Sequence, residues 1–294
     1  MISNFIRGST VIVFVVFGFT FNLSVILVVA AKRRLHKMHF FLLANLSMSD
    51  LLLHILATLV AVSQFKTQWV FGMAWCEKTL YLLRCALTTT KILLCAVTWE
   101  CHTAVVTPYS FSSDITLKKI TAVVLSWIGG FLITAVPFFG MGRIVYNEVT
   151  HTCEHVYLKE NKIGRLFLST LLLFFIPFGL IAKQQYQIHR AIRRQKIQIA
   201  QQQKAINANI DESQQRKMLM KSFKESKDAL IIVIGFLVSY LPLFVTINLR
   251  ANLQENDTLY NAWFLAVTLS QAGSTWNPII YCFRKREFRQ QLFK

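Results

Sequence analysis

Acidic side chains are scarce in this chain, in which 14 aspartate and glutamate residues stand against 32 lysines and arginines. Charged residues of both signs make up only 16% of the sequence, below the roughly 25% of soluble globular proteins. With 5 prolines and 11 glycines, the chain has no room for a collagen-like repeat or a long flexible linker. Because 54% of the residues are apolar, we expect the chain to lie in a membrane.

Long apolar segments dominate the chain instead. Seven of them, each about 20 residues or longer, follow at short intervals, and a bilayer core about 30 Å thick needs roughly 20 apolar residues per helical span. We therefore predict an all-α membrane protein, a single seven-transmembrane helix bundle over residues 1–294. The expected spans are 9–31, 38–62, 75–104, 117–138, 164–190, 217–249 and 259–283.

The net charge of +18 is distributed in a way that orients this bundle. Most lysines and arginines lie between spans 1 and 2, around the start of span 4, from the end of span 5 to the start of span 6, and after span 7. The positive-inside rule then predicts a multi-pass plasma membrane protein with its N-terminus outside. Attraction to anionic membrane lipids explains this charge better than nucleic acid, which we do not expect as a partner. The first span runs into a basic stop at 32–34, so we expect it to be a signal anchor.

Two of the six cysteines are expected on the outer side. Cys76 opens span 3 and Cys153 precedes span 5, so we predict a disulfide between them in the oxidising exterior. The spacing of the others suggests no zinc or iron–sulfur site. Asn256-Asp257-Thr258 is an outward-facing sequon, which makes Asn256 a glycosylation acceptor.

The stretch 190–227 is polar, rich in glutamine and lysine, and lacks proline and glycine. Helices 5 and 6 could extend through it beyond the membrane, or it could be a charged loop, and the sequence leaves both interpretations open.

Asp50 is the outstanding polar residue within the spans, where a charge is costly. Other spans offer it polar partners, and the set is Asn22, Thr90, Trp127, Ser274 and Asn277. This ring of groups could hold a sodium ion with waters, or it could be an interhelical hydrogen-bond network without an ion. Pro177, Pro242 and Pro278 each weaken a helix and would let the inner halves of spans 5, 6 and 7 move.

In order along the chain stand Asn22, the segment Leu43–Asp50, the Trp69-Val70-Phe71-Gly72 loop, Cys76 with Cys153, Trp127, Pro177, Phe236 with Pro242, and Asn277-Pro278-Ile279-Ile280-Tyr281. With these motifs the chain resembles the rhodopsin-like (class A) G-protein-coupled receptors over essentially its full length. The resemblance implies a short amphipathic juxtamembrane helix at 284–294. It also implies a heterotrimeric G-protein and arrestin as partners, contacting a face that includes Glu100, Cys101, His102, Pro108 and Tyr281.

Two departures from the family pattern bear on mechanism. The family ends span 3 with an acid, an arginine and an aromatic residue, but this chain has Glu100-Cys101-His102. In the family this arginine holds the cytoplasmic half of span 6 at rest and meets the G-protein in the active state. Cysteine cannot make its charged, bidentate contacts, so we expect this chain to lack that resting lock and part of the coupling surface. The tryptophan that the family places two residues before the span 6 proline is Tyr240 here.

Span 3 also carries two unusual cations, Arg84 and Lys91, about two turns apart and therefore on one face. Arg84 could pair with an anionic headgroup or carboxylate of a ligand, or with an outer-loop acid such as Glu154. Lys91 needs a partner if its ammonium is buried, and the Asp50 network beside Thr90 is the candidate, in which case lysine would replace sodium. Leu83 stands where amine receptors of the family carry an aspartate, so an amine ligand is not expected.

Parts of the sequence resemble opsins or melatonin receptors, including Val136-Pro137-Phe138-Phe139-Gly140-Met141-Gly142-Arg143. Gln271 occupies the position of the retinal-binding lysine of opsins, so we expect no covalent retinal. The resemblance implies a ligand pocket lined by Leu83, Arg84, Leu87, Ser169, Thr170, Tyr240, Leu243, Phe244, Val267 and Gln271, above a polar network of Asp50, Thr90, Ser274 and Asn277.

We therefore expect a receptor that transduces a small-molecule or short-peptide signal to a heterotrimeric G-protein. The alternative suggested by Cys101 is an atypical receptor that binds ligand with weak or no G-protein activation, as a decoy or through arrestin. A channel or transporter is disfavoured because the sequence lacks internal repeats. An enzyme is not expected because no nucleophile, base and oxyanion group converge in the spans.

Overall fold

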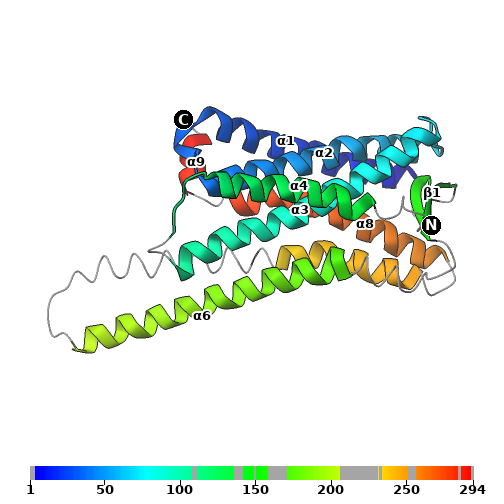
Figure 1. The fold of residues 1–294 in the computed structure, drawn as a ribbon. Coiled ribbons are helices and arrows are strands. Elements are labelled where there is room, and N and C mark those ends of the chain that lie inside the picture. The colour runs from blue at the N-terminus through cyan, green and yellow to red at the C-terminus, as the bar shows by residue number, and fades with distance from the viewer. Residues whose placement is uncertain are drawn as a thin grey trace.

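The structure, a computed structural model, describes residues 4–107, 111–135, 142–148, 150–157, 171–205, 231, 234–250, 256–283 and 286–292. Its architecture is the predicted helical bundle, in which the helices run side by side (Figure 1). The N-terminus and a β-hairpin lie at one end, here named the hairpin end, and the C-terminus lies at the other with the helix α9, here named the α9 end (Figure 1).

The first four helices are long and apolar enough to cross a bilayer. They are α1 (Asn4–Ala31), α2 (Met38–Lys66), α3 (Met73–Val106) and α4 (Leu117–Ala135), with a short 3-10 turn, η1 (Arg33–Leu35), between the first two. The helix α1 begins before the apolar stretch expected at 9–31, because the side chain of Arg7 is buried against other helices and not left in solvent.

The fifth and seventh spans are irregular near their prolines. The described part of the fifth span consists of the π-helical turn η3 (Leu171–Phe175) and α6 (Ile176–Ala205), with Pro177 at their junction. Residues 164–170 of the expected span lie outside the described residues. The sixth span is described as the helix Ile234–Arg250. The seventh is α8 (Asp257–Pro278), which continues into the π-helical turn η4 (Ile279–Phe283) before α9 (Arg286–Leu292). These π-helical turns stand where proline removes a backbone hydrogen bond.

The helix α6 projects past the ends of its neighbours at the α9 end (Figure 1). Gln195 Nε2 donates to the carbonyl of Val105, near the end of α3, at 3.3 Å, and α6 continues to Ala205. These further residues add about 15 Å of helix at 1.5 Å per residue. Of the two interpretations of the stretch 190–227, the extended helix is therefore correct as far as Ala205, and residues 206–227 lie outside the described residues.

The hairpin, which the sequence interpretation did not include, consists of β1 (Gly142–Asn147) and β2 (Thr152–Tyr157), paired antiparallel with Tyr146 opposite Cys153. A disulfide joins Cys153 to Cys76 in the first turn of α3, with the two Cα atoms 5.6 Å apart. Side chains of α2 hold the turn of the hairpin, since Ser63 donates to the carbonyl of His151 and Gln64 to that of Thr150.

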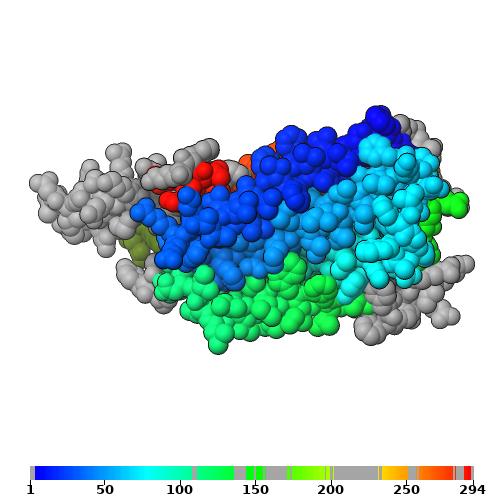
Figure 2. All heavy atoms as spheres, turned by 90° about the horizontal axis from the view of Figure 1, so that it is seen from above, coloured from blue at the N-terminus to red at the C-terminus, as the bar shows by residue number. Residues whose placement is uncertain are grey.

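Apolar packing concentrates between the helices, and the surface is apolar as well. Figure 2 shows a face on which α1, α2, α3 and α4 lie side by side. Phe17, Leu27, Leu125 and Leu132 are exposed on α1 and α4, which suits contact with lipid. At the α9 end, Phe288 of α9 is fully buried and stacks on Phe40 of α2 at 6.4 Å, so α9 is anchored to the bundle.

Candidate functional site

Asp50 is fully buried in α2, and both of its carboxylate oxygens accept hydrogen bonds. Thr90 Oγ1 of α3 donates to one at 2.8 Å, and Asn277 Nδ2 of α8 donates to the other at 2.9 Å. The hydroxyl oxygens of Ser49 and Thr90 are hydrogen-bonded at 2.8 Å, so a second side chain of α2 joins the network. Asp50 therefore connects three spans through direct hydrogen bonds.

The first span reaches the same region through Asn22, which donates to the carbonyl of Ser274 at 3.1 Å. The Ser274 side chain is itself fully buried. Trp127 does not contact Asp50 but donates to Asn45 at 3.4 Å. The side chains gathered around Asp50 offer oxygen atoms, which hard cations prefer. Within the part of the chain that the structure describes, no cluster of three histidine, cysteine or acidic residues could hold a metal.

Lys91 lies one residue beyond Thr90, and only 9% of it is exposed. Its Nζ is 4.6 Å from the centroid of the Tyr240 ring in the sixth span. Among the described residues no salt bridge joins Lys91 to Asp50, so the contact that stabilises the ammonium is a cation–π interaction with Tyr240, two residues before Pro242.

Aromatic rings fill the bundle around Tyr240. Phe236 lies 4.9 Å from the Tyr240 ring, and Phe174 of η3 contacts both Phe236 at 5.9 Å and Phe244 at 4.8 Å. Spans 5 and 6 therefore meet through stacked rings next to Pro177, so that a displacement of Tyr240 would be transmitted to the fifth span.

The other residues expected in the ligand pocket are distributed around this cluster. Leu83, Arg84 and Leu87 are half-buried along α3, Leu243 and Phe244 are half-buried in the sixth span, and in α8 Val267 is half-buried and Gln271 is buried. Ser169 and Thr170 lie outside the described residues.

At the hairpin end, Glu154 of β2 is bound to the sixth span. Arg250 Nη2 lies 3.0 Å from Glu154 Oε2, and Asn147 donates to the same oxygen at 3.3 Å. The Arg250 guanidinium also lies over the rings of Trp263 at 4.5 Å and Tyr260 at 5.4 Å. The hairpin is thus tied to α3 by a disulfide and to the sixth and seventh spans by this arginine.

A second arginine, Arg7 of α1, lies over the rings of Tyr260 at 5.5 Å and Phe264 at 5.2 Å. Its Nη2 donates to Asn261 at 2.9 Å, and the residue is 1% exposed. Burial, together with the positive charge of Arg7, lowers the pKa of His151 in the hairpin turn below its usual value of 6.5.

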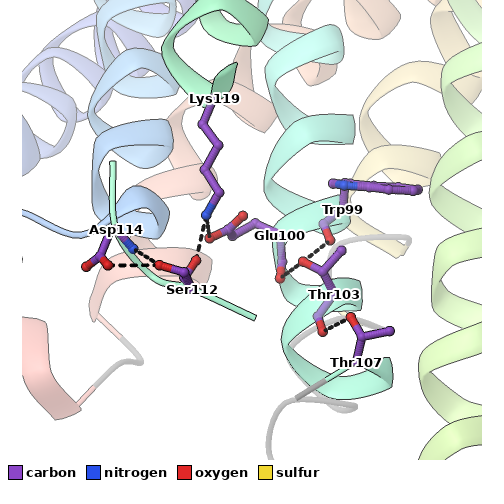
Figure 3. Close-up of polar contacts among 7 residues, drawn as sticks. All are labelled: Trp99, Glu100, Thr103, Thr107, Ser112, Asp114 and Lys119. Carbon is purple, nitrogen blue, oxygen red and sulfur yellow. Dashed lines mark hydrogen bonds and ion pairs between the residues drawn. The ribbon is translucent and has the colours of Figure 1, made fainter. Parts of the chain in front are cut away.

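The triplet Glu100-Cys101-His102, which departs from the family pattern, lies in the last two turns of α3, toward the α9 end. Glu100 is buried, and its Oε1 lies 3.3 Å from Nζ of Lys119 in α4 (Figure 3). Lys119 also donates to the carbonyl of Ser112 at 2.6 Å, and Ser112 Oγ is 2.9 Å from Asp114 Oδ2 (Figure 3). Glu100 thus has Lys119, in the next span, as its counter-ion.

Cys101 itself packs against an apolar cluster of Val105, Ile188 and Ile192 between α3 and α6. Thr98 of the same helix donates to Gln184 of α6. His102 stacks on Trp99 with the ring centroids 5.5 Å apart. Pro108 lies outside the described residues, and Tyr281 is the middle residue of η4.

Sequence reasoning missed Lys119, Arg250 and Arg7. Lys119 had a usable signal, because Glu100 without its neighbouring arginine needs another cation and Lys118-Lys119 begins the next span. Arg250 and Arg7 had none, since their aromatic partners in α8 become neighbours only in the folded bundle.

The comparisons with known proteins agree with this geometry. Residues 21–281 match the family described as 7 transmembrane receptor (rhodopsin family). The solved crystal structure of squid rhodopsin superimposes with a TM-score of 0.84 at 20% identity, covering 98% of this chain and 84% of that one. This likeness shows the shared fold.

Curated relatives match along nearly the whole chain at low identity. The alpha-1A adrenergic receptor of Oryzias latipes is 24% identical over 97% of this chain, the GQ-coupled rhodopsin of Mizuhopecten yessoensis 23% over 99%, and a melanopsin-like protein of Danio rerio 26% over 98%. The matched regions span 65%, 59% and 57% of these relatives' own lengths. Since the family match covers most of the chain, the chain belongs to the rhodopsin family of seven-transmembrane receptors.

Proposed function

We propose that the chain is a G-protein-coupled receptor that transduces an extracellular small-molecule or short-peptide signal to a heterotrimeric G-protein. Membership of the rhodopsin family supports this proposal, and the observation that carries it is the buried network around Asp50. This network joins α2, α3 and α8 close to the Lys91–Tyr240 contact, as a relay from a ligand to the opposite end requires.

The proposed orientation places the hairpin end outside the cell and the α9 end in the cytoplasm. The Cys76–Cys153 disulfide supports it because disulfides persist in the oxidising exterior. At the same end, Asn256 is exposed and caps α8, its Oδ1 accepting from the Leu259 amide at 2.8 Å. Its amide nitrogen, to which a glycan attaches, takes no part in this cap, so Asn256 is suited to be the glycosylation site.

In this scheme a ligand enters among the half-buried residues of α3, the sixth span and α8, and displaces Tyr240. Lys91 and the Phe236 ring move with it, the hydrogen bonds of Asp50 rearrange, and the α9 end of the bundle opens. Glu100, Cys101, His102, Pro108 and Tyr281 then contribute to the face that meets the G-protein or arrestin. Gln271 has no amine with which to form a Schiff base, so any retinoid ligand would bind without a covalent bond.

The test is recruitment of G-proteins to the chain in cells on addition of ligands. The Gq class is the first to examine, since one relative is a GQ-coupled rhodopsin. Recruitment of arrestin alone would favour the atypical receptor that Cys101 suggests.

A further inference from the structure

Among the described residues, the interior at the hairpin end holds more cations than acids. Arg7 is buried, Arg250 is largely buried, and Arg84 and Lys91 lie along one face of α3. Within the described residues, one acid forms a salt bridge with any of these cations. It is Glu154, whose Oε2 lies 3.0 Å from Nη2 of Arg250. The region therefore has a positive charge that the described acids do not balance.

Of these four cations, Arg84 has the fewest contacts in the described part of the chain. It is half-buried, and within the described ranges no hydrogen bond, ion pair or aromatic ring engages its guanidinium. Glu154, the acid that the sequence suggested as its partner, forms its printed contacts through Oε2 with Arg250 and Asn147, and among the described residues no ion pair joins it to Arg84. Arg84 is thus a partly desolvated cation without a visible counter-ion, an arrangement that costs free energy unless an anion joins it.

The direction of Arg84 follows from its place on the helix. It precedes Lys91 by seven residues, so the two side chains project from α3 on the same side, about 10 Å apart along the axis. Because Lys91 lies over the ring of Tyr240, this side faces the sixth span. Leu87 lies between the two cations in the sequence, and both Leu87 and Phe244 pack against the apolar cluster that includes Tyr240.

We propose that Arg84 binds the anionic group, a carboxylate or a phosphate, of an amphiphilic ligand whose apolar part packs along Leu87 and Phe244. The proposal rests on the proposed receptor function and names the ligand class of its pocket. A planar guanidinium suits both anions because it can donate two parallel hydrogen bonds. The apolar wall beneath it would exclude a small inorganic anion as the main ligand and would favour one with a hydrocarbon body.

The experiment measures ligand binding to the purified chain in nanodiscs of phosphatidylcholine, which adds no anionic lipid. The probes are oleate, oleoyl lysophosphatidate and, as an uncharged control, oleyl alcohol. Thermal unfolding is followed with a thiol-reactive dye, because Cys85 and Cys282 form no disulfide and are buried in the folded chain. At saturation we expect an anionic probe to raise the unfolding midpoint by about 5 °C or more, and the alcohol to leave it unchanged.

The variant Arg84→Gln should weaken the effective anionic probe by about tenfold to hundredfold, since it loses a charged hydrogen-bond pair. Arg84→Lys keeps the charge and should retain part of the affinity, and it serves if the glutamine variant fails to fold. Lys78→Gln is the matched control, because Lys78 is an exposed cation of the same helix. It should bind like the wild type.

Protection by only one of the two anions identifies the carboxylate or the phosphate as the source. Equal protection by oleyl alcohol, no protection by either anion, or equal affinity of wild type and Arg84→Gln would overturn the proposal. The assay contains no G-protein, so its outcome is separate from that of the receptor proposal. A chain that binds these anions but never activates a G-protein keeps this inference, whereas one activated only by uncharged or cationic ligands loses it.

Discussion

Lys91 is the residue that most changes the usual chemistry of such a bundle. An ammonium group deep among the spans is costly, and the Tyr240 ring at 4.6 Å offsets only part of this cost, about 2 kcal/mol for a desolvated cation–π contact. Lys91 follows Thr90, which donates to Asp50, so its charge lies close to the ring of groups that could hold a sodium ion. We propose that sodium can bind at Asp50, Thr90, Ser274 and Asn277 only weakly while this lysine is present.

The substitution Lys91→Met, which keeps the length of the side chain, tests this idea. We expect the variant to be as stable as the wild type or more so, because replacing a buried charge by a similar apolar volume is often stabilising by about 1–4 kcal/mol. Exchanging choline chloride for sodium chloride should raise the unfolding midpoint of the variant by a few degrees and leave the wild type unchanged. The double variant with Asp50→Asn is the control and should lose the response. An equal response of wild type and Lys91→Met would contradict the prediction.

His151 makes the hairpin sensitive to pH. Its pKa is lowered by burial and by Arg7, and Tyr146 Oη lies 3.3 Å from its Nδ1. The folded chain therefore favours the neutral imidazole, and protonation favours the unfolded chain, so the stability contributed above about pH 6.5 is lost as the pH falls below it. The unfolding midpoint should drop between pH 7.5 and 5.5 by more in the wild type than in His151→Asn. Asparagine suits the positive φ of 51° at this position, and identical pH profiles would refute this role of His151.

We propose that an ion pair between α3 and α4 serves as a lock at the α9 end, in place of the contact that the family makes with its span 3 arginine. Glu100 and Lys119 form an ion pair with 8% and 26% of their side chains exposed, so the pair is sheltered from water. The same lysine fixes Ser112 in the connection between the helices, and the backbone of this connection reaches α2 through the Met38 amide and the Ser113 carbonyl at 2.8 Å. These contacts hold residues 112 and 113, in the described part of the connection, against α4 and α2.

Removing this ion pair should loosen the resting conformation. We expect Lys119→Gln to raise the basal rate of nucleotide exchange on a coupled G-protein by about fivefold, equivalent to an ion pair of about 1 kcal/mol. Lys118→Gln is the matched control, because Lys118 is the exposed neighbour in the same turn of α4. The rates are measured in membranes with equal receptor content, and the same rate for both variants would argue against the lock.

The helices could be predicted from the sequence to a greater extent than the contacts between them. Apolar length predicted the bundle, and Asp50, Thr90 and Asn277 meet as the polar pattern suggested. The hairpin was not predicted, because the disulfide and the hydrogen bonds of Ser63 and Gln64 that hold it join residues far apart in the sequence. Likewise, the sequence suggested Glu154 as a partner of Arg84, but in the folded chain Glu154 pairs with Arg250, which is 96 residues away in the sequence. Such choices depend on tertiary distances that local patterns do not contain.

The molecule as a whole combines a familiar bundle with an altered end. Cys101 packs with Val105, Ile188 and Ile192, where the family has an arginine. If the triplet limits coupling, Cys101→Arg should raise nucleotide exchange in membranes, because the guanidinium restores a charged contact for the G-protein. Cys101→Leu is the control, since it changes the side chain without adding charge. An unchanged rate in the arginine variant would show that the triplet is not limiting.

The most direct test of the central claim is recruitment of G-proteins to the wild-type chain in cells, measured across all G-protein classes with arrestin in parallel. The panel of ligands contains lipids, peptides and amines, and surface expression is confirmed in the same cells. We predict recruitment of at least one G-protein class by a ligand of the panel, which would show that Cys101 is compatible with coupling. Silence at every G-protein, together with a response at arrestin, would contradict the account.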